Sequence, residues 1–161
     1  MPTARVIFVT PRPTRTPRPT PTPNASSYYS KGEAYYKDGK YQLAINEYST
    51  GIQLDPNAAH TYISRARAYN TLGQYQLAIQ DYTKAIQLDR FNAIAYDNRG
   101  VSYSELGQNQ AAIADYTEAI YLDPNYVPAY NNRGHAYNAL GQDTLADADK
   151  AKACSLDSQY C

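Results

Sequence analysis

Residues 59–92 read AHTYISRARAYNTLGQYQLAIQDYTKAIQLDRFN, and residues 93–126 read AIAYDNRGVSYSELGQNQAAIADYTEAIYLDPNY. The two stretches are equally long, and tyrosine, glycine, alanine and leucine fall at the same places in both. The same period of 34 residues extends back to residue 25 and forward to residue 160 without an insertion or deletion. The body of the chain is therefore a repeat of four units, 25–58, 59–92, 93–126 and 127–160.

Each unit predicts two helices joined by a tight turn. Tyrosines stand at the fourth and eleventh positions of every unit with a small residue between them, which places all three on one helix face. Glycine at the fifteenth position, as in Gly73, ends the first helix because it takes left-handed dihedrals without strain. A second helix then runs to a Leu-Asp pair such as Leu88-Asp89. One helix pair cannot bury its apolar face alone, so the units must stack into a solenoid.

The period and its small/large code resemble the tetratricopeptide repeat (TPR) family over residues 25–161. The resemblance implies an all-α, right-handed superhelical solenoid of antiparallel helix pairs. It also implies a non-catalytic scaffold that binds a peptide or partner protein in its concave groove. Two departures stand out. Gly51 replaces alanine and should loosen its helix, and the polar stretch 143–156 is expected to close the array as a solvated helix.

The same resemblance supplies candidate groove residues on the first helix of each unit. Tyrosine there can stack on a ligand, and Asn can bond a peptide backbone as both donor and acceptor. The alternative is that these are ordinary solvated helix residues. The Lys/Arg/Asn clamp with which the family's chaperone-tail binders hold a terminal carboxylate is absent. The candidates are Tyr29, Tyr36, Arg67, Asn98, Asn131, Asn132 and His135.

A charge pattern recurs in every unit, with a basic residue at the seventh position and an acidic one 16 residues later. One interpretation is a basic ladder for an acidic ligand. The other, which we favour because every positive charge has a matched negative one, is a set of structural ion pairs. The basic residues are Lys31, Arg65, Arg99 and Arg133, and the acidic residues are Glu47, Asp81, Asp115 and Asp149.

The 18 tyrosines invite comparison with proteins that stack on RNA or sugars. Eleven of them occupy the fourth, eleventh and twenty-fourth repeat positions, which are helix-packing positions in such an array. We therefore predict that these eleven belong to the core.

Composition and motifs exclude several classes of function. The charges balance, with 15 basic and 15 acidic residues, which argues against a dedicated nucleic-acid or anionic-membrane binder. No run of apolar residues is long enough for a transmembrane helix. His60 and His135 belong to no metal motif, and no phosphate loop or nucleophile elbow is present. We expect no enzyme activity, no metal and no cofactor.

Residues 1–24 form a Pro/Thr/Arg-rich arm with seven of the ten prolines, four arginines and no acid. Proline blocks helix and sheet, so a disordered linker of polyproline-II type is expected. The stretch Arg5–Val9 fits either the tail of a missing anchor or a short apolar start. Two alternative functions remain: weak contact of the arm's arginines with anionic surfaces or nucleic acid, or a structural role in which the helical array packs against further copies or a larger chain. We otherwise expect a monomer, exported or on the surface of a bacterium.

Two cysteines remain. Cys154 stands where the other units have isoleucine, which predicts a buried apolar residue. Seven residues along one helix is about 10 Å, too far for a disulfide with Cys161. If the chain reverses near Asp157-Ser158, however, the two sulfurs can meet and pin the last helix. Both alternatives remain open from the sequence.

Overall fold

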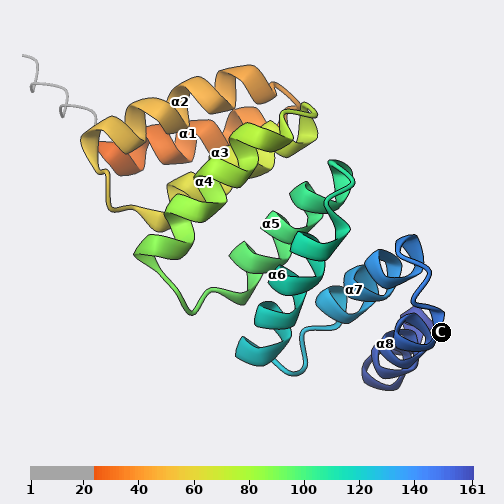
Figure 1. Cartoon of the computed structure of the whole chain (residues 1–161). Helices are drawn as coiled ribbons and strands as arrows, with labels where there is room; N and C mark the ends of the chain where they lie inside the picture. Colours follow the sequence, from red (N-terminus) through yellow and green to blue (C-terminus); the bar gives the residue numbers. More distant parts are fainter. Residues whose placement is uncertain (1–23) are drawn as a thin grey trace, which may run out of the picture.

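The computed structural model describes residues 24–161, so the arm, including Arg5–Val9, lies outside the described residues except for Asn24. The described chain is a succession of α-helices that ends in one short 3-10 turn (Figure 1). The elements are α1 (Ala25–Lys37), α2 (Tyr41–Leu54), α3 (Ala59–Thr71), α4 (Tyr75–Leu88), α5 (Ala93–Glu105), α6 (Asn109–Leu122), α7 (Val127–Ala139), α8 (Asp143–Leu156) and η1 (Ser158–Tyr160).

The helices stack in chain order as four hairpins that follow one another across the molecule (Figure 1). Each helix packs against the next one, both within a unit and between units. The odd-numbered helices also contact the next odd-numbered helix: α1 with α3, α3 with α5, and α5 with α7. The predicted all-α solenoid of helix pairs is thereby confirmed.

The turn inside every hairpin has the same physical basis. Gly39, Gly73, Gly107 and Gly141 all have φ between 70° and 73°, and no other described residue has a positive φ. In the first unit the Gly39 N–H donates to the carbonyl of Tyr36, and the Lys40 N–H donates to that of Tyr35. This Schellman pair satisfies carbonyls that the helix end leaves free, and it recurs in all four units.

The core of each hairpin is a tyrosine packed against small residues. Tyr48, Tyr82 and Tyr116, at the twenty-fourth repeat position, are at most 2% exposed. Their rings fill the space over Gly32, Ala66 and Gly100, the small residues of the facing helix. Of the other eight tyrosines predicted to lie in the core, Tyr62 and Tyr130 are buried and the remaining six are only half-buried. Three of these six, Tyr69, Tyr103 and Tyr137, pack against core residues.

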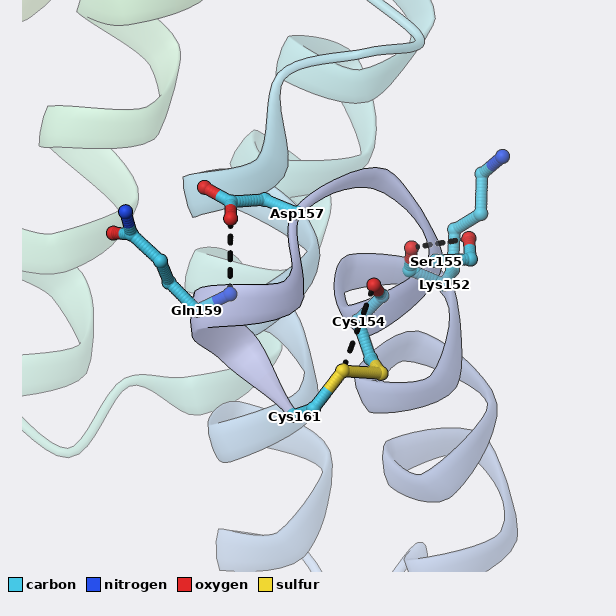
Figure 2. Close-up of a disulfide and its surroundings, with 6 residues drawn as sticks. All are labelled: Lys152, Cys154, Ser155, Asp157, Gln159 and Cys161. Atoms are coloured by element: carbon cyan, nitrogen blue, oxygen red, sulfur yellow. Dashed lines mark hydrogen bonds between the residues drawn. A yellow bond between two sulfur atoms is a disulfide. The ribbon is translucent and has the colours of Figure 1, made fainter.

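The C-terminal end is held by a disulfide between Cys154 and Cys161 (Figure 2). Helix α8 ends at Leu156, and Asp157 takes extended dihedrals. The chain therefore reverses at Asp157, which is the condition that the sequence set for a disulfide. The Asp157 carboxylate accepts a hydrogen bond from the Gln159 N–H at 2.9 Å and caps η1 (Figure 2). The two Cα atoms then lie 4.7 Å apart. In the structure Cys154 is therefore half of a cross-link and only partly buried.

Candidate functional site

Helices α1, α3, α5 and α7 contact one another in succession along one side of the array. A stack of helix pairs curves toward the side on which its helices lie closer together, so these four helices form the concave inner face. All seven candidate groove residues lie on these four helices. The structure separates them into residues that already have partners within the chain and residues that do not.

The two tyrosines of the first unit are engaged by the second unit. The Tyr29 ring meets the His60 ring edge-on at 4.7 Å between centroids. The Tyr36 ring lies under the Arg67 guanidinium, 4.9 Å from its centre, and the Tyr36 hydroxyl is 3.3 Å from the Thr71 hydroxyl. Both tyrosines are half-buried. Tyr36 therefore orients Arg67 through a cation–π contact, and only part of each ring is open to a ligand.

The asparagines fall into two groups. The Asn132 side chain donates to the Asp97 carboxylate at 3.0 Å and so links α7 to α5. Within residues 24–161 the side chains of Asn98, Asn131 and His135 make no hydrogen bond. His135 is exposed and the other two are half-buried.

Asp97 is an inner-face residue that the candidate set missed. Its side chain is 4% exposed, and burial raises its pKa from the ordinary 3.8 to about 6. Hydrogen bonds from Asn132 and Tyr126 favour the ionised form but only partly offset the burial. One signal was available in the sequence: the other units carry Tyr29, Ile63 and Asn131 at this position, so a carboxylate breaks the pattern.

Asp97→Asn should stabilise the chain at neutral pH. Because the folded state raises the pKa, it favours the protonated acid, and its stability falls as the pH rises from about 4 to about 6. Asparagine removes this penalty and keeps an acceptor for Asn132. We expect a gain of about 1–2 kcal/mol at pH 7.5 that disappears near pH 4. Urea unfolding of both proteins across this range measures it.

Asp115→Asn is the matched control, because Asp115 is equally buried but bonded to an arginine. It should destabilise the chain at pH 7.5. Equal stability of Asp97→Asn and the natural chain at pH 7.5 would show that the Asp97 charge has no net cost.

The recurring charge pattern is an internal ion-pair ladder. Each basic residue pairs with the acidic residue 16 positions later in its own unit, at 2.7 to 2.9 Å. In units two to four the arginine also donates to a hydroxyl of the preceding unit: Arg65 to Ser49, Arg99 to Thr83 and Arg133 to Thr117. Each guanidinium lies between two tyrosine rings, such as Tyr96 and Tyr103 for Arg99. The structural interpretation of the pattern therefore holds, and the ladder offers no free basic row to a ligand.

The described residues hold no group of three His, Cys, Asp or Glu side chains placed to bind a metal ion. Among the helices of residues 24–161, none combines the length and the apolar character that crossing a membrane requires.

Comparisons with known proteins agree on the family. The profile described as TPR repeat matches residues 32–71, 66–107 and 102–141, and the profile described as tetratricopeptide repeat matches residues 127–160. A comparison of this chain with curated protein sequences found no match.

Solved structures with the same architecture include three useful relatives. A crystal structure of MamA is 27% identical, with a TM-score of 0.81 over 84% of this chain and 80% of that one. The first TPR of Spaghetti (RPAP3), bound to the HSP90 peptide SRMEEVD, is 33% identical, with a TM-score of 0.72 over 73% and 94%. The Arabidopsis OM64 TPR domain is also 33% identical, with a TM-score of 0.69 over 71% and 94%. With repeat matches across residues 32–160 and this shared architecture, the chain belongs to the tetratricopeptide repeat family of protein-interaction scaffolds.

Proposed function

We propose that this protein is a non-catalytic adaptor that binds an extended peptide segment of a partner protein along its inner face. The observation that carries the proposal is a contrast between two rows of polar residues. The ladder charges are all paired within the chain. On the inner face, Arg67, Asn98, Asn131 and His135 have no hydrogen-bond or ion-pair partner among residues 24–161.

These four side chains give the inner face the chemistry that a peptide backbone requires. The two amides each offer donors and an acceptor, and the Arg67 guanidinium offers donors only. The helices that carry them are packed before binding, so ordering the site costs little free energy. The RPAP3 relative, whose printed description names a bound HSP90 peptide, supports a peptide as ligand here.

Tyr29, Tyr36 and Asn132 have a different role in this proposal. Because they already bridge neighbouring units, they fix the spacing and direction of the free groups. Tyr36 holds the Arg67 guanidinium over its ring, and Asn132 positions α7 beside α5.

A random-peptide display selection against the full chain tests the proposal. The test variant carries Arg67→Ala, Asn98→Ala, Asn131→Ala and His135→Ala. The matched control carries four alanines at exposed glutamines of α4 and α6: Gln76, Gln80, Gln87 and Gln110. We expect peptides that bind the natural chain and the control but bind the test variant at least tenfold more weakly, with helicity unchanged in all three. Peptides that bind all three proteins equally would contradict binding at the inner face.

A further inference from the structure

One buried side-chain oxygen in residues 24–161 lacks a hydrogen-bond partner, and it is the Tyr82 hydroxyl. The Tyr82 side chain is fully buried. Its counterpart Tyr48, by contrast, donates to the Glu33 carboxylate at 2.6 Å. Leaving a buried hydroxyl unpaired costs free energy, so this exception requires an explanation.

The repeat shows where the Tyr82 hydroxyl lies. Tyr48 reaches Glu33 on its own unit's first helix and has Ser64 of the next unit as a second hydrogen-bonding neighbour. The residues at the corresponding places around Tyr82 are Arg67 and Asn98. The electrostatics agree: burial is the main cause that raises the pKa of Tyr82, Arg67 lowers that pKa, and Tyr36 and Asp97 raise it further. The hydroxyl is therefore under the middle of the inner face, between α3 and α5.

The polar groups around this point have opposite charges. Arg67 is a cation with free donors, and the carboxylate of Asp97 lies within electrostatic reach of the same hydroxyl. A ligand carboxylate would gain the attraction of Arg67 but meet the repulsion of Asp97, and a ligand ammonium would meet the reverse. A neutral group that both accepts and donates avoids both penalties. Asn98, whose amide is free, can exchange two hydrogen bonds with another amide.

We propose that Arg67, Tyr82 and Asn98 form a subsite for an uncharged carboxamide, the Asn or Gln side chain of the bound peptide. This deepens the proposed function and rests on it. The ligand carbonyl accepts from the Arg67 guanidinium and the Tyr82 O–H, and the ligand NH₂ donates to the Asn98 side-chain oxygen. Arg67 is exposed, so its guanidinium can turn from the Tyr36 ring toward the ligand and still donate to the ligand carbonyl. Binding then gives Tyr82 the partner that it lacks in the free chain.

The free chain supplies the first test. Tyr82→Phe removes an unpaired hydroxyl and should raise the urea midpoint or leave it unchanged. Tyr48→Phe removes the bond to Glu33 and should lower the midpoint. If Tyr82→Phe lowers the midpoint as much as Tyr48→Phe does, the hydroxyl has a partner inside the protein and the proposal is wrong.

Binding supplies the second test. Peptides recovered on the full chain are resynthesised with Gln, Glu or Lys at each position in turn, and their affinities are measured. At one position we expect Gln to bind about tenfold more tightly than Glu or Lys, which corresponds to one or two hydrogen bonds. Tyr82→Phe should abolish this preference, and Tyr116→Phe, at the same repeat position, should keep it.

The outcomes separate this subsite from the proposed function. Peptides that depend on the inner face but prefer Glu or Lys at every position, or whose Gln preference survives Tyr82→Phe, overturn the carboxamide subsite alone. A selection with no peptide that depends on the inner face overturns both.

Discussion

Arg99→Met lowers the free energy of unfolding of the full chain by about 3 kcal/mol at pH 7, because it leaves a buried carboxylate without its partner. Arg99 donates two bonds to the Asp115 carboxylate, each at 2.8 Å, and one to the Thr83 hydroxyl at 3.1 Å. The Arg99 and Asp115 side chains are 16% and 9% exposed. Methionine keeps the aliphatic bulk between the tyrosine rings, so the loss reports on the charge and the hydrogen bonds. Urea unfolding followed by circular dichroism measures it.

Two further variants locate the effect. Arg99→Met combined with Asp115→Leu removes both charges and should recover most of the lost stability, since a buried ion pair adds little over an apolar pair. Lys31→Met removes the corresponding residue of the first unit, whose side chain is 57% exposed, and should change stability little. If Arg99→Met and Lys31→Met have the same small effect, the ladder does not hold the units together.

Gly100→Ala is the second large effect, with an expected loss of about 1–3 kcal/mol from overpacking. A Cβ at this position would stand 2.6 Å from the Tyr116 ring, which is 2% exposed. Alanine favours a helix over glycine by up to about 1 kcal/mol, so a net loss shows that packing outweighs propensity. Thermal and urea unfolding together measure it.

Gly51→Ala provides the opposite expectation at another buried helical glycine. The nearest atom to its added Cβ lies at 3.4 Å, an ordinary contact, so the helix gains propensity without a clash. We expect a gain of about 0.5–1 kcal/mol. If Gly100→Ala also stabilises the chain, the Tyr116 ring has more freedom than its burial indicates.

The sequence determined the elements of this protein because they depend on local geometry. The helices end where the recurring glycine and Leu-Asp signals predict, since a glycine at positive φ terminates a helix whatever its neighbours are. The ion-pair ladder could also be predicted from the sequence. Two positions 16 residues apart lie on the two helices of one hairpin, and their charges match in every unit.

Which inner-face groups are free depends on the tertiary structure, because the partner of each group is a residue about one repeat away. Asn131 and Asn132 are adjacent and identical in sequence, yet Asn132 alone meets the buried Asp97 of the preceding unit. Tyr48 and Tyr82 hold the same repeat position, yet Glu33 satisfies the first and nothing in residues 24–161 satisfies the second. The repeat fixes where a side chain stands, and its neighbours across the stack determine whether a donor or acceptor remains for a ligand.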